Sequence, residues 1–174
     1  MKLTRITTIY DGEEDRFHLL GTTLEDESLE LWITQRLLGR MVKVLLEWLE
    51  GNSKEQLGSH SQSSQAQSSV QTFAQQNANA AWESSVPVEK QISTESHLLG
   101  EVDIQRGDEH VVLVFKLPEQ QVAELLLDST HLRQWLTIVM AQWINAEWPA
   151  DLWPQWMQQA GAEVEHSGGS LSLH

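Results

Sequence analysis

The spacing of apolar side chains changes several times in the N-terminal part of the chain, and each spacing predicts an element. Residues 3–10 and 16–23 are strand-like, and the acidic sequence DGEED between them predicts a hairpin turn. Residues 29–33 (LELWI) alternate, which is typical of a third strand with one buried face. Thr34 follows this strand, and its hydroxyl group can cap a helix that starts at the next residue.

A long apolar helix is predicted over about residues 35–50. Its apolar side chains cover an arc of about 200° around the helix axis. The remaining narrow stripe is charged and consists of Arg36, Arg40, Lys43, Glu47 and Glu50. One face of a sheet cannot cover so wide an arc, so we expect a second apolar surface to pack against this helix. That surface is either a helix of the second half of the chain or the same helix of a second copy in a symmetric dimer.

The second half of the chain repeats this order of elements. Strands are predicted at 97–104, 110–117 and 122–127, and the sequence QRGD forms the turn between the first two. One of residues 128–130 (DST) can cap a helix over about residues 130–147. This second helix is apolar along one face, which is the surface that we expect to cover the first helix.

The matching order of elements predicts an internal duplication. The aligned pairs are Glu30 with Glu124, Leu31 with Leu125, Leu37 with Leu132, Val44 with Val139, and Trp48 with Trp143. We therefore expect an α+β fold in which an antiparallel sheet or split barrel of about six strands is built from two similar β-β-β-α halves. Two long helices are expected to pack together on one side of this sheet, followed by a short Trp-rich helix near the C-terminus.

The composition divides the chain into two halves of one domain, a linker and a tail. The halves are residues 1–51 and 97–160. Residues 52–96 are rich in Ser, Gln and Asn and contain few apolar side chains to offset the entropy of ordering, which predicts a disordered linker. Residues 161–174 include the sequence SGGSLS and predict a disordered tail.

Two groups of aromatic residues are candidate partner-binding sites. Within the linker, residues 70–82 can form a transient helix that carries Phe73 and Trp82, which are either a docking element or incidental aromatics. After the second long helix, two prolines punctuate the sequence EWPADLWPQWMQQAG. Its large apolar side chains include Trp148, Trp153, Trp156 and Met157. They either close the end of the core as a lid or form an aromatic binding surface.

The chain is strongly acidic, with 25 Asp and Glu residues against 11 Lys and Arg residues and a net charge of −14. This balance argues against nucleic acid or an anionic membrane surface as the partner. The absence of cysteine removes disulfides, thiolate metal ligands and a cysteine nucleophile, and it fits a reducing cytoplasm. No apolar stretch has the length of a signal peptide or of a membrane-spanning helix. We therefore expect a soluble cytoplasmic protein.

No motif in the sequence predicts catalysis, a metal ion or a cofactor. The 7 histidines include no pair at the spacing that a metal site on a helix needs. The acidic sequences DGEED and EDE lie in predicted turns and do not match a calcium-binding loop. A glycine-rich phosphate loop and a nucleophile elbow are both missing. We expect a non-enzymatic protein without a cofactor.

These observations lead to three hypotheses for function. The first is an interaction protein, such as an adaptor, accessory factor or assembly subunit, that binds a protein partner through the apolar helix and the Trp-rich segment. The second is an acidic inhibitor or immunity-type protein that occupies a basic site, although the acidic residues are spread along the whole chain. The third is a small-molecule binder or enzyme with a pocket between helices and sheet. Arg36, Arg40 and Lys43 either pair with nearby acids or contact an acidic partner.

Overall fold

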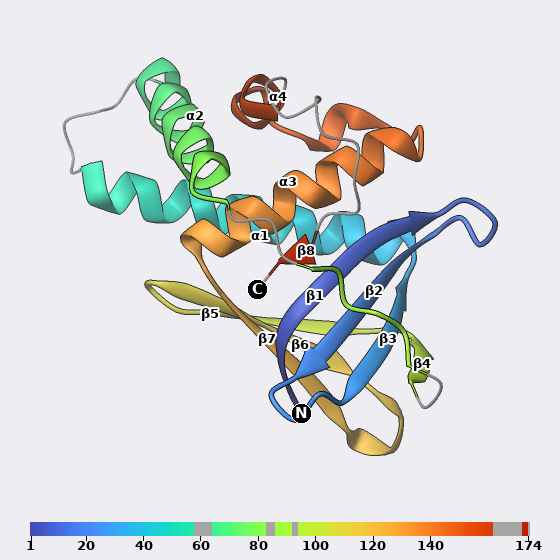
Figure 1. Cartoon of the computed structure of the whole chain (residues 1–174). Coiled ribbons are helices and arrows are strands. Elements are labelled where there is room, and N and C mark those ends of the chain that lie inside the picture. The colour runs from blue at the N-terminus through green and yellow to red at the C-terminus, as the bar shows by residue number, and fades with distance from the viewer. Residues whose placement is uncertain (58–63, 83–85, 92–93, 162–171, 174) are drawn as a thin grey trace.

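The N-terminal strands form an antiparallel meander, as their apolar pattern predicts (Figure 1). A computed structural model of the chain describes residues 1–57, 64–82, 86–91, 94–161 and 172–173. Strand β1 (Lys2–Asp11) pairs with β2 (Arg16–Thr23), and β2 pairs with β3 (Ser28–Ile33). The Asp11 carboxylate accepts two backbone N–H groups of the first turn, which is a common way for aspartate to stabilise a turn.

The second half contains three antiparallel strands in the same order. These are β5 (Val102–Arg106), β6 (His110–Lys116) and β7 (Val122–Asp128). The halves join where β7 pairs with β1, which places Leu3 beside Leu125. The two strands at this joint, β1 and β7, are outer strands of their meanders and run parallel to each other. The sheet is therefore mixed, which corrects the expectation of an antiparallel sheet, and a duplication of the halves stays a prediction.

The edges of the sheet differ from the prediction in a second way. In the described part of the chain, seven strands follow the order β4-β3-β2-β1-β7-β6-β5, and the short β8 (Ser172–Leu173) pairs with β1. The stretch predicted as one strand over residues 97–104 contributes to both β4 (Glu95–Leu98) and β5, because the chain leaves one edge of the sheet and continues on the other. Four steps along the chain separate Leu98 from Val102, which limits their distance to roughly 15 Å. Opposite edges that lie so close require the sheet to curl into a half-barrel (Figure 1).

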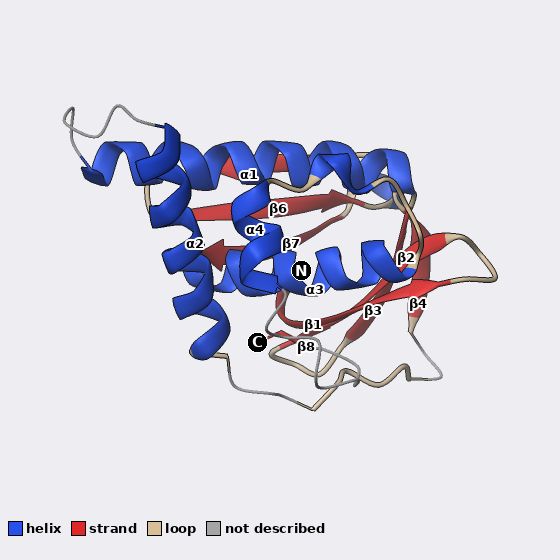
Figure 2. Ribbon diagram, turned by 90° about the horizontal axis from the view of Figure 1, so that it is seen from above, coloured by secondary structure: helices blue, strands red, loops and turns tan. Residues whose placement is uncertain are grey.

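The described part of the chain contains four α-helices. They lie on one side of the curled sheet (Figures 1 and 2). They are α1 (Gln35–Leu57), α2 (Ser64–Ala80), α3 (Ser129–Asn145) and α4 (Gln155–Gly161), with 3-10 turns η1 (Pro118–Gln120) and η2 (Ala150–Leu152). The predicted caps are confirmed: Thr34 Oγ1 accepts the N–H of Leu37, and the Asp128 carboxylate accepts the N–H of His131. Helix α4 is the predicted short Trp-rich helix, whereas α1 is longer than predicted.

The wide apolar arc of α1 is covered by both the sheet and α3, as expected. Leu38 and Leu45 of α1 are fully buried and belong to the same core as Leu113 of β6 and Leu136 of α3. Trp143 of α3 packs against α1 at Gly39. A Cβ atom added to Gly39 would lie 3.5 Å from the Trp143 ring. Each large apolar side chain that leaves water stabilises the fold by about 1.5–3 kcal/mol, so this shared core holds both helices in place.

The segment of residues 52–96 differs from the predicted disordered linker. Its described part includes the end of α1, helix α2, a strap at residues 86–91 and strand β4. Few apolar side chains are present, but buried Gln71 and Gln75 of α2 make hydrogen bonds to backbone carbonyl groups of α1 and α3. Polar contacts to distant residues thus order a segment whose composition predicts disorder. Residues 58–63, 83–85, 92–93, 162–171 and 174 of the predicted linker and tail lie outside the described residues.

Candidate functional site

A groove runs between helix α1 and strand β5. Its volume is about 420 Å³. The apolar residues that line it come from both elements and are Leu37, Met41, Val44, Val102 and Ile104. The other lining residues are Arg40, Gly100, Glu101, Asp103 and Arg106. Most of the apolar lining residues are half-buried, so the groove leaves apolar surface in contact with water.

The distance between α1 and β5 is fixed by hydrogen bonds at one end of the groove. Trp48 Nε1 donates to the carbonyl oxygen of Gly107 at 2.8 Å, and Asn52 Nδ2 donates to that of Asp108 at 2.8 Å. Both acceptors lie in the turn between β5 and β6. Because the Trp48 ring is also buried, α1 is anchored to this turn and runs beside β5.

Strand β5 has one paired and one open edge. In an antiparallel pair, alternate residues direct both their N–H and their C=O toward the partner strand. The bonds from Gly107 N–H to His110 and from Lys116 N–H to Glu101 show that the odd-numbered residues of this stretch face β6. The residues whose backbone groups face the opposite edge are Val102, Ile104 and Arg106. No other strand pairs with that edge in the described part of the chain.

Basic side chains without an acidic partner gather beside this groove. Among the described residues on or near the groove, Arg36, Arg40, Lys43 and Arg106 have no ion pair; elsewhere in the described fold the same holds for Lys2, Arg5 and Arg133. Arg40 and Arg106 line the groove, and Arg36 and Lys43 lie on the exposed stripe of α1. The Asp103 carboxylate, in contrast, forms an ion pair with Lys116 Nζ at 2.6 Å. This carboxylate raises the pKa of Lys116. Two of the 11 basic residues of the chain, Arg40 and Arg106, therefore line the groove together with the acidic residues Glu101 and Asp103.

The C-terminal aromatic residues are buried and do not form a free surface. The exposed fractions of Trp148, Trp153, Trp156 and Met157 are 8%, 3%, 4% and 0%. Trp148 contacts the Tyr10 ring edge-on at 5.4 Å, and its Nε1 donates to Asp15 at 3.1 Å. Trp156 Nε1 donates to Glu50 at 3.1 Å. Because the rings are buried and the N–H groups of Trp148 and Trp156 find acceptors within the chain, the structure favours the lid over a binding surface. Trp153 Nε1 is buried and has no hydrogen-bond partner among the described residues.

The two aromatic residues of the predicted linker do not lie at the groove. Phe73, on α2, is 65% exposed, whereas Trp82 is half-buried and packs against the core. Neither residue lines the groove between α1 and β5. An exposed phenylalanine alone is ordinary for a protein surface, so Phe73 does not define a second site.

Of the residues predicted to bind a partner, the structure places one, Arg40, in the lining of the groove. Arg36 and Lys43 lie one turn before and after it on the same helix. Sequence analysis missed the contribution of β5. The available signal was the alternation within the sequence VDIQR, but the open edge depends on strand pairing, which the sequence alone does not show.

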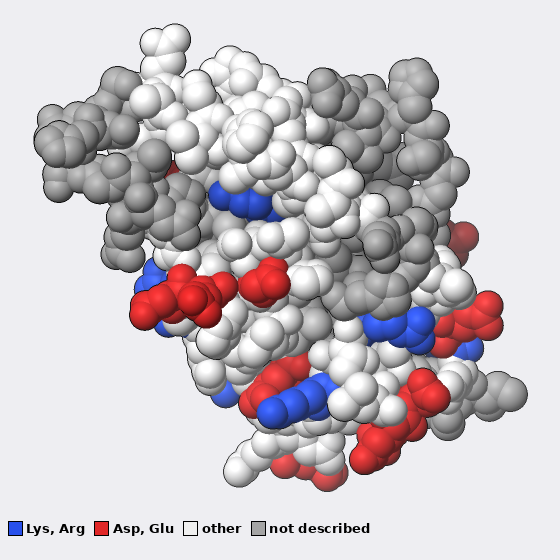
Figure 3. Space-filling model, turned by 60° about the vertical axis from the view of Figure 1, so that its left-hand side comes forward, with Lys and Arg blue, Asp and Glu red and all other residues white. Residues whose placement is uncertain are grey.

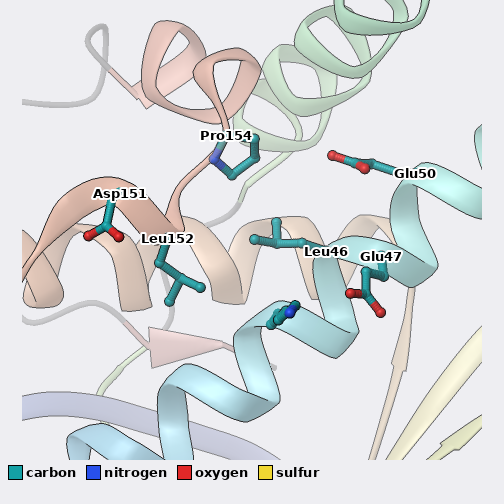
Figure 4. Close-up of a pocket in the computed structure, with 7 residues that line it drawn as sticks. Leu46, Glu47, Glu50, Asp151, Leu152 and Pro154 are labelled. Atoms are coloured by element: carbon teal, nitrogen blue, oxygen red, sulfur yellow. The ribbon is translucent and has the colours of Figure 1, made fainter.

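A smaller hollow lies on the other side of α1, against the segment that precedes α4 (Figure 4). Its volume is about 180 Å³. It is lined by Lys43, Leu46, Glu47, Glu50, Asp151, Leu152 and Pro154. Leu46 and Leu152 extend toward the same space, and three carboxylates surround it. Since Glu50 already accepts the indole N–H of Trp156, this hollow is a weaker candidate than the groove.

A charged cluster lies on the face of β3 that points away from the helices. The Glu30 carboxylate is 2.7 Å from Lys90 Nζ and 2.9 Å from His18 Nε2, although the ring N–H is not aligned for a hydrogen bond. Burial acts to raise the pKa of Glu30, but hydrogen bonds from Lys90 and Ser96 and the charge of His18 outweigh it and lower that pKa. Burial also lowers the pKa of His18. Because Lys90 belongs to the strap, the cluster attaches residues 86–91 to the sheet.

The comparisons with known proteins give no indication of function. Protein-family models, curated proteins and solved structures yielded no match to this chain. Across the residues that the structure describes, no three His, Asp or Glu side chains are arranged to hold a metal ion. Within the same residues, no helix has both the length and the apolar character that crossing a bilayer requires. The functional argument therefore depends on the groove itself.

Proposed function

We propose that this is a non-enzymatic interaction protein, of the adaptor, accessory-factor or assembly-subunit kind, that binds a protein partner between α1 and β5. The observation that carries the proposal is a water-exposed apolar groove bordered by an open strand edge. Apolar surface of this kind marks interaction sites, and arginine, present here as Arg40 and Arg106, is enriched in interfaces. We place the protein in the cytoplasm, because a chain without cysteine fits a reducing compartment.

A small-molecule ligand is the second candidate for the groove. The volume of about 420 Å³ lies within the range of roughly 300–1,000 Å³ that is usual for ligand sites. However, one side of the groove is a strand edge whose backbone groups can pair along their length with another chain. This feature favours a protein partner over a compact ligand.

An acidic inhibitor of a basic target receives less support. Such a protein needs its carboxylates gathered on one surface, where they match the charge of the target. On the face shown in Figure 3, acidic and basic side chains are interspersed, and helix α2 carries no charged residue.

The proposal is tested by co-purification from the native host with a matched pair of variants. Val44→Glu places a carboxylate on the half-buried wall of the groove, whereas Leu24→Glu makes the same change at a residue that is 87% exposed in the β2–β3 turn. We expect a specific partner with the parent chain and with Leu24→Glu, and at least about tenfold less of it with Val44→Glu. Recovery of no specific partner, or equal recovery with all three proteins, would contradict the proposal.

A further inference from the structure

We infer that the partner at the groove is a second copy of this chain, in a two-fold symmetric dimer whose β5 strands pair edge to edge and antiparallel. This inference rests on the proposed function and names the partner. Three features support it: an open strand edge with a self-complementary sequence, an apolar wall beside that edge, and a charged stripe on α1 that is basic in one half and acidic in the other.

The backbone of β5 directs the polar groups of three residues away from β6. Val102, Ile104 and Arg106 turn their N–H and C=O groups to the open edge, as the register with β6 requires. Proteins commonly block such an edge with a proline, a bulge or a covering element. The sequence VDIQR has no proline, its register with β6 has no shift, and no other described strand pairs with this edge. The edge can therefore receive a strand.

The sequence of β5 is suited to pairing with an identical strand. A two-fold axis at Ile104, perpendicular to the sheet, places Ile104 opposite its equivalent and Val102 opposite Arg106 of the second copy. Each of these pairs exchanges two main-chain hydrogen bonds, because all three residues direct their backbone groups to the open edge. On the outer face, Asp103 then lies opposite Gln105. An axis at Asp103 would instead place two carboxylates opposite each other, which is destabilising, so the register at Ile104 is favoured.

The second copy covers apolar surface that a single molecule leaves in contact with water. Val102 and Ile104 direct their side chains to the face of the sheet that α1 covers, and both are half-buried. Leu37 and Val44 of α1, across the groove, are also half-buried. In the symmetric pair both α1 helices lie on the same face of one continuous sheet, so the two grooves join across the axis. Contact between their apolar walls removes this surface from water, which favours association.

The axis at Ile104 also fixes the position along α1 about which the two helices are related. Helix α1 runs beside β5, and the two are joined where Trp48 donates to the Gly107 carbonyl. Gly107 lies roughly 10 Å along the strand from Ile104, given a rise of about 3.3 Å per residue. The same distance along α1, at about 1.5 Å per residue, leads from Trp48 back to Met41. The two α1 helices therefore run antiparallel about a point near Met41.

Exposed charges on either side of this point are opposite in sign. Arg36 precedes Met41 and Glu47 follows it at a similar distance, and the two lie about three helical turns apart on one face of α1. Both are exposed and have no ion pair in the described chain. The axis directs Arg36 of each copy toward Glu47 of the other, which offsets part of the repulsion between two chains of net charge −14. Arg40 and Lys43 lie nearest the axis, and their long side chains can extend into water.

The dimer is measured on the full-length protein by native mass spectrometry and sedimentation equilibrium, and amide hydrogen exchange locates its interface. We expect a dimer that dissociates on dilution, with the amides of residues 102, 104 and 106 protected only at high protein concentration. Val44→Glu in the groove wall should weaken the dimer at least about tenfold, whereas the exposed change Leu24→Glu should not. A tagged chain should then recover the untagged chain as its partner.

A matched pair of variants tests the pairing of the strands. Ile104→Pro removes an N–H that faces the open edge and leaves the bonds to β6 intact. Ile104→Val keeps this N–H, and valine has as many side-chain carbons as proline. We expect the proline variant to dimerise at least about tenfold more weakly than the valine variant, because each copy loses a main-chain hydrogen bond.

A charge exchange on α1 tests the pairing of the helices at exposed positions, where folding is not at risk. Arg36→Glu and Glu47→Arg should each weaken the dimer by about fivefold, because each brings like charges together at two symmetric places. The double variant restores opposite charges and should dimerise like the parent protein. Glu47→Arg also reduces the net negative charge, which by itself favours association, so a weaker dimer in this variant identifies the local pair.

Three results would overturn the inference. A protein that stays monomeric at every soluble concentration has no second copy in its groove; if a different protein then co-purifies in a way that depends on Val44, the proposed function stands. A dimer that leaves the three amides unprotected, or that is equally strong in Ile104→Pro and Ile104→Val, forms elsewhere on the molecule. A double charge exchange that does not recover the parent affinity contradicts the antiparallel arrangement of α1. Circular dichroism checks folding, and if Ile104→Pro does not fold, the exchange pattern and the charge variants decide.

Discussion

At the scale of single residues, Trp48 connects the core to the candidate site. Its ring is 6% exposed within the apolar face of α1, and its Nε1 donates to the Gly107 carbonyl at 2.8 Å. The helical period of the sequence predicts the burial of this side chain. The acceptor is 59 residues away, in the β5–β6 turn, and no local pattern indicates it. One side chain therefore stabilises the fold and also positions the wall of the groove.

Replacement of this side chain tests its contribution to stability. We expect Trp48→Ala to lower the free energy of unfolding by about 3–5 kcal/mol, because it removes a buried aromatic ring and leaves a cavity. Trp48→Phe retains most of the ring but loses the hydrogen bond, with an expected loss of about 0.5–1.5 kcal/mol from that bond. Urea unfolding measures both values. Glu47→Ala, at the exposed neighbouring position, is the control, and a near-neutral Trp48→Ala would show that the ring is not part of the core.

At the scale of elements, helix α2 is held by polar contacts in place of an apolar stripe. Gln75 Nε2 donates to the Arg133 carbonyl at 3.0 Å and to Thr137 Oγ1 at 2.9 Å. The Arg133 guanidinium, 5% exposed, donates to Gln71 and lies 5.4 Å from the Trp156 ring centre. Burial lowers its pKa to about 10, and no described carboxylate pairs with it. Docking of α2 therefore depends on a few buried hydrogen bonds.

Removal of the buried guanidinium tests this account of α2. Arg133→Met keeps an unbranched side chain of similar length but removes the donor to the side-chain oxygen Oε1 of Gln71. A hydrogen bond to a charged group contributes about 1.5–3 kcal/mol, so hydrogen exchange in α2 should accelerate by roughly tenfold to a hundredfold. Phe73→Ala, on the exposed face of α2, should leave exchange unchanged. Unchanged exchange in Arg133→Met would mean that other contacts hold the helix.

The comparison of α2 with the other elements shows what a sequence pattern can predict. The strands of both meanders, the caps Thr34 and Asp128, and the two long helices follow from contacts within a few residues, and all are present. For helix α2 the sequence predicted only a transient helix over residues 70–82, and its full length and ordered packing were missed because its partners lie on α1 and α3, far along the chain. The break between β4 and β5 was missed for a similar reason, since it depends on which sheet edge each part of the chain joins.

At the scale of the whole molecule, the strap of residues 86–91 packs on the outer face of the sheet. Ionisable side chains hold it there, together with a backbone hydrogen bond. Val88 N–H donates to Thr7 Oγ1 at 2.8 Å, and Lys90 pairs with Glu30, which also lies beside His18. Burial lowers the pKa of His18 below its ordinary value of 6.5, and the pKa of Glu30 lies below 4.5 because its ion pairs and hydrogen bonds outweigh burial. The stability of the molecule therefore depends on pH through this cluster.

The sign of that dependence follows from the two pKa directions. The unfolded chain binds a proton at His18 more readily than the folded protein does, so stability falls as the pH decreases from 6.5 through the folded pKa. The contribution of Glu30 is present above 4.5 and is lost as the pH falls through its depressed folded pKa. Urea midpoints measured between about pH 8 and pH 3 should decrease in these two windows.

Two variants separate this cluster from general acid destabilisation. His18→Gln should flatten the decrease in the upper window and leave the lower one, because glutamine cannot take up the proton. His110→Gln, at an exposed residue at the start of β6, should keep the pH profile of the parent protein. If the His18→Gln profile matches the parent profile in the upper window, His18 does not couple folding to pH.

The sequence by itself determined the strands of the two meanders, the two long helices, their caps and turns, and the apolar faces that form the core. These features depend on residues within one or two turns of each other, so short-range periodicity reports them. Only the tertiary structure decided that the sheet is mixed and curled, that α2 is ordered, that the C-terminal tryptophans are buried, and that β5 has an open edge beside α1. Each of these outcomes depends on contacts between segments that are far apart in the sequence, such as the hydrogen bond between Gln75 and Arg133, which are 58 residues apart. The local pattern of apolar and polar residues carries no information about such contacts.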